Sequence, residues 1–456
     1  MALPGNSRIA LGICFRAGKG IVPFGWLLAV ISCFIMGVSN APIAHAADSR
    51  LLPCSIYYTP AWTDCYGIWR TSTGETYAGE WKDGMRHGQG VLTLRTGAKY
   101  QGEFANGAAS GRGTYLLRNG DKYEGDVVNG VIQGYGAMTL ENGDKYTGDF
   151  VAFKFNGRGT FKSTNGEIYS GAFVNDQRQG QGSLELPDGS KYIGNFHNST
   201  FEGYGVLTNK DGTKYSGAFV RGKKQGQGTL LMSNGVQYTG GFLNDFYEGQ
   251  GVVTTPEGGR FEGGLYEGKK TGNGRLILGK TEQFPPKVIL TVRANSVFLS
   301  SIVSYEGPFL QDQMSGDGVA LLSNGAVYRG AFERGKFNGI GSITLPDGVT
   351  LFCSFFDHEI VGQVTVGLLD GSRYMGDVKD SKLSGNASIH YPNGNMYQGA
   401  AFDALPDGVG SLRLAGGGTY VGGFKGGVFD GVGVMYEADN KTIRRGFWKN
   451  GKLANN

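Results

Sequence analysis

Proline, cysteine and histidine are all scarce in this sequence. The 456 residues include 13 prolines, 5 cysteines and 5 histidines, beside 81 glycines. So little proline excludes a collagen triple helix and argues against a disordered tract rich in proline and glycine. The histidines are scattered, with no spacing typical of a metal site. We therefore expect no metal and no cofactor.

A long apolar run occurs near the N-terminus, from Ile21 to Val38. Arg8, Arg16 and Lys19 precede it, and Ala44-His45-Ala46 follows it. This order is typical of an export signal, so we predict a signal peptide over residues 1–46. The mature protein would then be extracytoplasmic, either periplasmic or secreted.

Two alternatives for this segment stay open. An uncleaved membrane anchor is the first, because eighteen apolar residues just span a bilayer, although Pro23 and Gly25 weaken the helix. The second is a lipoprotein cleavage box at Val30-Ile31-Ser32-Cys33, which is followed by apolar rather than polar residues.

Loss of the signal would leave Cys54, Cys65 and Cys353. In an oxidising compartment Cys54 and Cys65 are the natural pair, closing a short loop worth about 3 kcal/mol in the chain-entropy model. The alternative is two unpaired buried thiols. Cys353 stands where other repeats carry glycine, and we expect an inert core thiol there.

The abundant residues recur with a fixed period. Almost every step between the recurring aromatic residues is 23 residues, and they lie at Tyr77, Tyr100, Tyr123, Tyr146, Tyr169, Tyr192, Tyr215, Tyr238, Phe261, Tyr305, Tyr328, Tyr374, Tyr397 and Tyr420. A typical unit contains Tyr100-Gln101-Gly102-Glu103-Phe104, then Gly111-Arg112-Gly113, and then Asn119-Gly120. Aromatic, glycine and apolar residues alternate with polar ones, so each unit is predicted to be a two-stranded β-hairpin.

The joints between units are mostly Asn-Gly or Asp-Gly pairs, such as Asn142-Gly143 and Asp188-Gly189. These pairs favour the positive φ angles that tight hairpin turns need, so consecutive units should continue one antiparallel sheet. The glycine of Y-x-G-x-F leaves room for a ring to lie across the backbone. A phosphate-cradling role for the G-x-G pairs fails, because every unit has them and no helix follows.

The unit Y-x-G-x-F, G-x-G-x-L, N-G closely resembles the MORN repeat. The resemblance implies an all-β fold, an elongated single-layer antiparallel array of β-hairpins. It also implies a role in association, through membrane attachment, protein scaffolding or self-assembly, and it brings no catalytic residues. The sequence departs from the pattern at Leu351, Cys353, Val364 and Ala387.

The repeat divides the chain into segments. We predict an N-terminal cap with the cysteine pair at 47–76, nine repeats at 77–278, an insertion at 279–304, six repeats at 305–436 and a C-terminal cap at 437–456. Glycines 274 and 279 with Lys280 and Thr281 match a phosphate-loop pattern, but Leu276 and Leu278 belong to a repeat strand and Pro285-Pro286 block the necessary helix.

The insertion is the most individual stretch. Val288–Val292 and Ser296–Leu299 are predicted to pair as an apolar hairpin. Two interpretations stay open: an ornament folded onto its own sheet, or a surface for a partner or for self-association. The candidate interaction residues are Val288, Leu290, Val292, Val297, Phe298 and Leu299.

Loops within the units carry basic residues, among them Lys223, Lys224, Lys269 and Lys270. They form a candidate anion-binding edge for lipid headgroups or envelope polymers. Acids interrupt this edge, so ordinary solvated turns are the alternative.

The function predicted from these features is a non-catalytic scaffold or adaptor for protein association at the cell envelope. The alternative is peripheral attachment to anionic membrane lipid. The expected partners are a protein or a second copy, or membrane lipid; neither nucleic acid nor a small-molecule substrate is expected.

Overall fold

The computed structural model describes residues 51–57, 60, 62–279, 288–292, 295–299, 301–379, 382–439 and 441–454. The chain divides into two units, Met1–Pro187 and Asp188–Asn456. The predicted signal peptide lies outside the described residues. Within the described ranges, no helix is long and apolar enough to cross a membrane.

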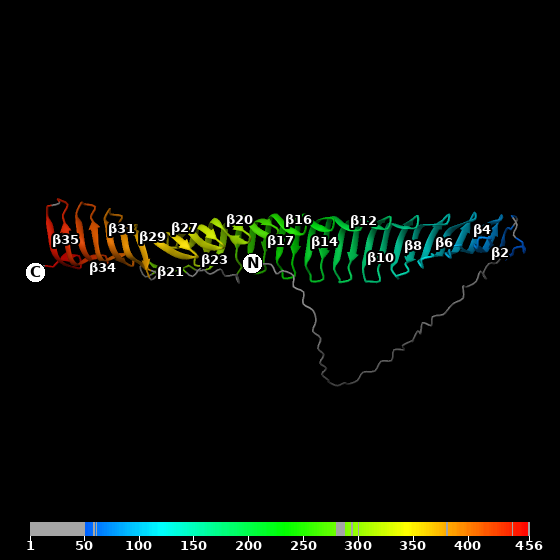
Figure 1. Cartoon of the computed structure of the whole chain (residues 1–456), viewed down its shortest axis with the longest axis horizontal. Coiled ribbons are helices and arrows are strands. Elements are labelled where there is room, and N and C mark those ends of the chain that lie inside the picture. Colours follow the sequence, from blue (N-terminus) through cyan, green and yellow to red (C-terminus); the bar gives the residue numbers. More distant parts are fainter. Residues whose placement is uncertain are drawn as a thin grey trace, which may run out of the picture. The chain divides into compact units, whose positions relative to one another are not determined.

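The described residues of the first unit form β-strands that lie side by side in chain order (Figure 1, blue to green). Their bounds are β1 Leu52–Pro53, β2 Cys65–Arg70, β3 Thr76–Lys82, β4 Met85–Thr93, β5 Lys99–Ala105, β6 Ala108–Leu116, β7 Lys122–Val128, β8 Val131–Thr139, β9 Lys145–Val151, β10 Lys154–Lys162, β11 Ile168–Val174 and β12 Gln177–Glu185.

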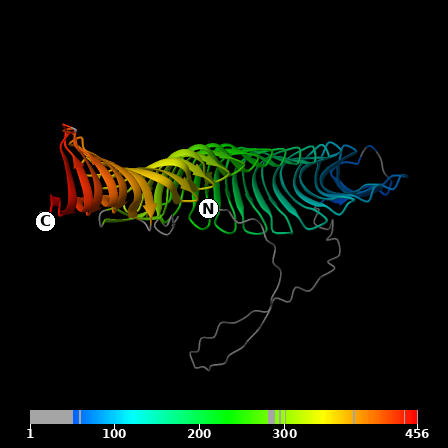
Figure 2. The same cartoon turned by 60° about the vertical axis from the view of Figure 1, so that its left-hand side comes forward.

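The second unit continues the same hairpin pattern. Its strands are β13 Lys191–His197, β14 Thr200–Thr208, β15 Lys214–Val220, β16 Lys223–Leu231, β17 Gln237–Leu243, β18 Phe246–Thr254, β19 Arg260–Tyr266, β20 Lys269–Ile277, β21 Val288–Val292, β22 Asn295–Leu299, β23 Ile302–Leu310, β24 Gln313–Met314, β25 Gly316–Leu322, β26 Val327–Glu333, β27 Lys336–Thr344, β28 Thr350–Phe356, β29 Glu359–Gly367, β30 Arg373–Lys379, β31 Lys382–His390, β32 Met396–Phe402, β33 Leu405–Arg413, β34 Thr419–Lys425, β35 Val428–Tyr436, β36 Ile443–Lys449 and β37 Lys452–Leu453. In Figure 2 these strands run from green through yellow to red, and the direction of the yellow to red strands rotates progressively.

Strand pairing within each unit is antiparallel between neighbours, as the repeat predicted. Exceptions occur at the N-terminal end and at the insertion. β1 pairs in parallel with β2. β20 pairs directly with β23, so the array continues past the inserted residues. The inserted strands β21 and β22 pair with each other, as predicted, and β21 also pairs in parallel with β31.

Burial alternates along the first strand of most units, which confirms the predicted two faces. In β5, for example, Tyr100, Gly102 and Phe104 are buried while Lys99, Gln101 and Glu103 are exposed. We call the face that carries the tyrosines the inner face and the opposite one the outer face. The inner face is the core of each unit.

In most units the inner-face tyrosine lies across two glycines of its own hairpin, whereas the Tyr374 unit has Ala387 at the second glycine position. A Cβ atom at Gly228 would sit 2.7 Å from Cε2 of Tyr215, and one at Gly217 would meet the same ring. The Tyr215 hydroxyl donates to the carbonyl of Ala218 at 3.0 Å, and the other described repeat tyrosines bond to the same position of their own units. Glycine is therefore structural here, as predicted, and its role is to admit the ring.

The two glycines of each G-x-G pair have different structural roles. The second glycine lies under the ring, whereas the first has a positive φ, such as +66° at Gly226. At this point the register of β15 with β16 shifts, which marks a β-bulge. Each unit therefore has one bulge in its second strand.

Tight turns lie at the joints, as the Asn-Gly pairs predicted, and also at the other end of the hairpins. At the first of these joints Gly120 N–H donates to the Leu117 carbonyl at 3.1 Å. At the joints only the glycine has a positive φ, as at Gly120, and Leu117 N–H bonds to the Asp121 carbonyl. Within the units, the predicted loops are two-residue turns with both φ angles positive, including Ala152 and Phe153. Phe153 N–H donates to the Ile132 carbonyl of the preceding unit, which holds this unfavourable conformation in place.

The repeat that begins at Leu351 replaces the ring with aliphatic side chains. Leu351, Cys353 and Val364 are all buried, with 5% exposure or less. No tyrosine lies across β28 and β29. The side chains of Cys353 and Val364 therefore fit where other repeats have glycine. The departures at Leu351, Cys353 and Val364 therefore compensate for one another: loss of the ring leaves room for the two added side chains. Burial raises the pKa of Cys353 to about 12, which agrees with an inert thiol.

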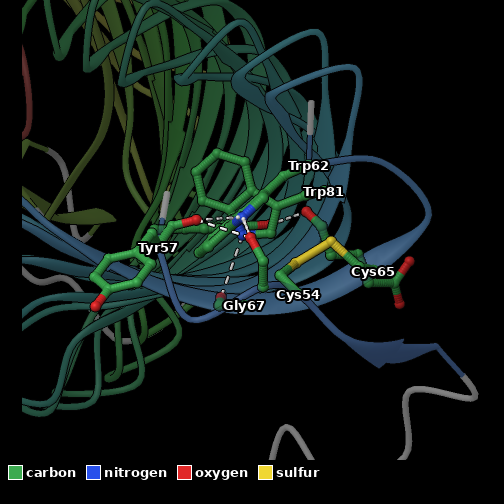
Figure 3. Close-up of a disulfide and its surroundings, with 9 residues drawn as sticks. Cys54, Tyr57, Trp62, Cys65, Gly67 and Trp81 are labelled. Carbon is green, nitrogen blue, oxygen red and sulfur yellow. Dashed lines mark hydrogen bonds between the residues drawn. A yellow bond between two sulfur atoms is a disulfide. The ribbon is translucent and has the colours of Figure 1, made fainter. Parts of the chain in front are cut away.

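The N-terminal cap closes the inner face of the first unit (Figure 3). Cys54 and Cys65 form the predicted disulfide, and Trp62 is buried with its ring 5.2 Å from that of Trp81. The Trp62 indole N–H donates to Ser55 Oγ at 2.8 Å. Trp448 near the C-terminus is also buried, and its indole donates to the Gly433 carbonyl.

Candidate interaction surfaces

The inner face presents a row of side chains that lie over the tyrosine rings. This row comes from the position nine residues after each tyrosine. In several repeats the residue is aromatic, as where Phe201 stacks on Tyr192 at 3.8 Å between ring centroids. In others it is a cation, with Lys224 Nζ 5.6 Å from the Tyr215 centroid and Lys270 Nζ 5.4 Å from that of Phe261.

The lysines of the predicted anion-binding edge differ in burial and in their partners. Lys224 and Lys270 cover rings, have only 24% and 15% of their side chains exposed, and pair with Asp245 and Asp312. Their charge is therefore used within the array. Lys223 and Lys269 are exposed. Anion binding at this edge stays a prediction, and half of the proposed residues already have intramolecular partners.

The outer face of β33–β36 carries an apolar surface that the sequence reasoning missed. Val409 and Val432 have 74% and 77% of their surface exposed, and Val421 and Phe447 are also exposed. Val432 lies opposite Phe447, and Val409 lies opposite Gly423, which has no side chain. We call these four residues the C-terminal outer patch. Ile340 and Phe352 expose further apolar surface on the outer face of β27 and β28.

A sequence signal for this patch existed. Val409 and Val432 occupy the middle of G-x-G, where other units have residues such as Gln89, Gln227 or Gln250. An apolar residue at a position that the strand alternation places in solvent is a sign of an interaction surface.

Comparison with protein families matches the MORN repeat. The matched segments are residues 77–99, 100–122, 123–145, 146–168, 169–191, 192–214, 215–237, 238–260, 328–350, 374–396 and 420–441, more than half of the chain. The chain belongs to the MORN-repeat family. The comparison with curated proteins returned no match.

Among solved structures, the MORN chain is similar to the TCP domain of SAS-4 from Drosophila melanogaster in complex with a proline-rich motif of Ana2. That match has 16% identity and a TM-score of 0.22, and covers 38% of this chain and 88% of that chain. The TCP10 domain of Danio rerio CPAP with a STIL peptide matches at 10% identity and a TM-score of 0.12, over 74% and 95% of the two chains. TM-scores this low give neither likeness weight for fold or function.

In this MORN array the predicted insertion, 279–304, overlaps the first residues of the following strand. β20 ends at Ile277 and β23 begins at Ile302, which is buried. The backbone of the inserted hairpin reaches β31, where Thr291 pairs with Lys382. The side chains of Val288, Leu290, Val292, Val297, Phe298 and Leu299 lie outside the described part of the structure.

On the inner face of the second unit, side chains on β27, β29 and β31 are more deeply buried than those before the insertion. Leu207, Leu230 and Val253, which precede the insertion, are half-buried. After it, Ile343, Val366 and Ile389 on β27, β29 and β31 are at most 2% exposed. The backbone position therefore favours the first interpretation, a hairpin folded onto its own sheet. Association through the insertion stays a prediction.

The described residues that could bind a metal ion are dispersed over the array. Among the described residues, no group of three or more His, Cys, Asp or Glu side chains is placed to hold a metal ion. The phosphate-loop-like stretch runs along β20 as far as Ile277, and its Lys280 and Thr281 lie outside the described residues.

Proposed function

We propose that this MORN array is a non-catalytic scaffold of the cell envelope that holds a protein partner on the C-terminal outer patch. The observation that carries the proposal is the exposure of Val409, Val421, Val432 and Phe447 on four consecutive strands. A soluble monomer rarely leaves large apolar side chains grouped on one face.

The geometry suits a protein more than a small ligand. Four neighbouring β-strands present the patch, and each such side chain would contribute about 1.5–3 kcal/mol if a partner buried it fully. The strands of the patch are paired with their neighbours along their length, so little backbone would have to be ordered on binding.

Location at the envelope rests on separate observations. The predicted signal peptide would export the chain, and the Cys54–Cys65 disulfide is stable in an oxidising compartment. The non-catalytic assignment is supported by the dispersal of histidines and by the structural use of the tyrosine and glycine pattern.

Charge insertion into the patch tests the proposal. We expect Val409→Asp with Val432→Asp to abolish crosslinking to the protein partner in intact cells, and detergent extraction of the unmodified chain to retain that partner. Val220→Asp with Leu243→Asp is the matched control, since both residues are exposed but flank turns in β15 and β17. Unchanged melting temperatures show that folding is intact.

Two results would overturn the proposal. One is equal crosslinking by the patch variant and the control variant. The other is association that disappears on detergent extraction and returns on vesicles with anionic lipid, which is the behaviour expected of peripheral lipid attachment.

A further inference from the structure

The outer face of the first unit carries a row of lysines beside the joints, apart from Arg112 and Arg158, which lie in the middle of G-x-G on β6 and β10. Lys99, Lys122, Lys145 and Lys162 are all exposed there, on β5, β7, β9 and β10. Lys145 lies directly opposite Lys162, a like-charge pair that destabilises a sheet unless an anion screens it. Lysines on alternate strands repeat about every 9.6 Å. We call these four residues the lysine row.

Acids on the same face are engaged by the backbone. Asp126 Oδ2 accepts from Tyr135 N–H at 3.1 Å, and Asp149 Oδ2 accepts from Arg158 N–H at 3.0 Å. Both contacts cap the β-bulges of their units. Glu124 lies beside the row and pairs with Lys122 at 2.5 Å. Structural use of the acids therefore leaves the lysines as the prominent charge of this edge.

A hollow of about 350 Å³ opens between the first two lysines of the row. Lys99 and Lys122 form part of its wall, Leu116 and Val91 provide apolar surface, and Gln101 and Thr114 contribute an amide and a hydroxyl. Leu116 lies between the two lysines in the strand register. Two lysines, an apolar surface and hydrogen-bonding side chains thus line one small volume.

We propose that the lysine row binds an acidic polysaccharide, with one uronate residue seated in this hollow. Its carboxylate would accept charge-assisted hydrogen bonds from Lys99 and Lys122. Its C–H surface would lie on Leu116, and its hydroxyls would bond to Gln101 and Thr114. The chain of sugars would then extend along the sheet to Lys145 and Lys162.

Other polyanions fit this surface less well. Single-stranded nucleic acid is bound by successive aromatic stacking platforms, and the residues on either side of the row are polar or small: Gln101, Thr114, Thr147 and Thr160. A membrane surface would use a broad basic or amphipathic patch rather than a narrow row with a hollow.

Binding of the full chain to immobilised polygalacturonate tests the assignment, with dextran as the neutral polymer. We expect each lysine replaced by glutamine to weaken binding roughly fivefold, and Lys99→Gln, Lys122→Gln and Lys145→Gln together to weaken it about a hundredfold. Glu124→Gln should strengthen binding, because it releases Lys122. Binding should also fall as salt rises.

The matched control removes three positive charges from the opposite end of the hairpins. Lys82, Lys154 and Lys425 are exposed and flank two-residue turns, and their triple glutamine variant should bind as the unmodified chain does. Equal loss in the control and row variants would overturn the proposal, as would equal binding to dextran, or stronger binding to vesicles of phosphatidylglycerol. The protein patch belongs to β33–β36, so failure here leaves that proposal untouched.

Discussion

At the scale of single residues, one tyrosine and two glycines determine the inner face of most repeats. The ring covers both glycines, and its hydroxyl satisfies a backbone carbonyl, as Tyr215 does with Ala218. The repeat at Leu351 shows the alternative solution, in which aliphatic side chains at three positions fill the space of the ring. Ring and glycine should therefore be energetically coupled.

A double-mutant cycle measures this coupling. Gly228→Ala alone should cost about 1–3 kcal/mol, because its Cβ would lie 2.7 Å from the Tyr215 ring. Tyr215→Leu alone should cost about 2 kcal/mol. We expect the double variant to cost less than the sum, by about 1 kcal/mol or more, in urea unfolding. Additive effects would contradict the account.

His358 makes the stability of its turn dependent on pH. Its Nδ1 accepts from Phe337 N–H at 3.2 Å, and burial, followed by the charge of Lys336, lowers its pKa below the usual value. The folded state therefore binds a proton less readily than the unfolded state. Its contribution to stability is fully present above the unfolded pKa, about 6.5, and is lost as pH falls.

Asp312 accepts the equivalent backbone bond from Lys270 N–H, which supplies a conservative control. We expect His358→Asp to keep the turn while reducing the loss of melting temperature between pH 7.5 and 5.5. An identical pH profile in the two proteins would show that His358 has no such role.

At the scale of elements, the two-residue turns store strain that neighbouring units hold in place. Ala152 has a φ of +48° in the turn between β9 and β10. Glycine accepts this conformation without steric cost, so Ala152→Gly should raise stability by about 1 kcal/mol. Ala137 lies within β8, where Ala137→Gly should lower stability by about 0.5–1 kcal/mol. Thermal unfolding of both variants checks the opposite signs.

At the scale of the whole molecule, the insertion can be removed without breaking the repeat. Leu278 N–H bonds to the Val303 carbonyl, just as Leu117 N–H bonds to that of Asp121 across Arg118-Asn119-Gly120. Residues 279–302 can therefore be replaced by Arg-Asn-Gly. We expect the β-sheet circular dichroism to persist, with a lower melting temperature and new binding of an apolar dye at the inner face around Ile343.

An unchanged melting temperature and no dye binding would refute the covering role of the inserted hairpin. Protein association lost in this variant, with folding intact, would instead support the predicted partner surface at Val288–Leu299.

The repeat period predicted the hairpins and the inner face because both depend on local alternation. It did not predict the tight turn at Ala152-Phe153, since a bond to the preceding unit overrides the preferences of these residues. It also placed Lys224 in a free basic edge, whereas the folded register puts that lysine over Tyr215. Such roles depend on neighbours 9 to 21 residues away, which composition and charge alone do not identify.

The scaffold proposal is tested most directly by a photo-crosslinking amino acid placed at Val432 in the full chain, with the same group at exposed Ser216 on β15 as control. We expect a discrete protein adduct from position 432 in intact cells and none from position 216. Adducts with lipid alone, or equal protein labelling from both positions, would contradict it.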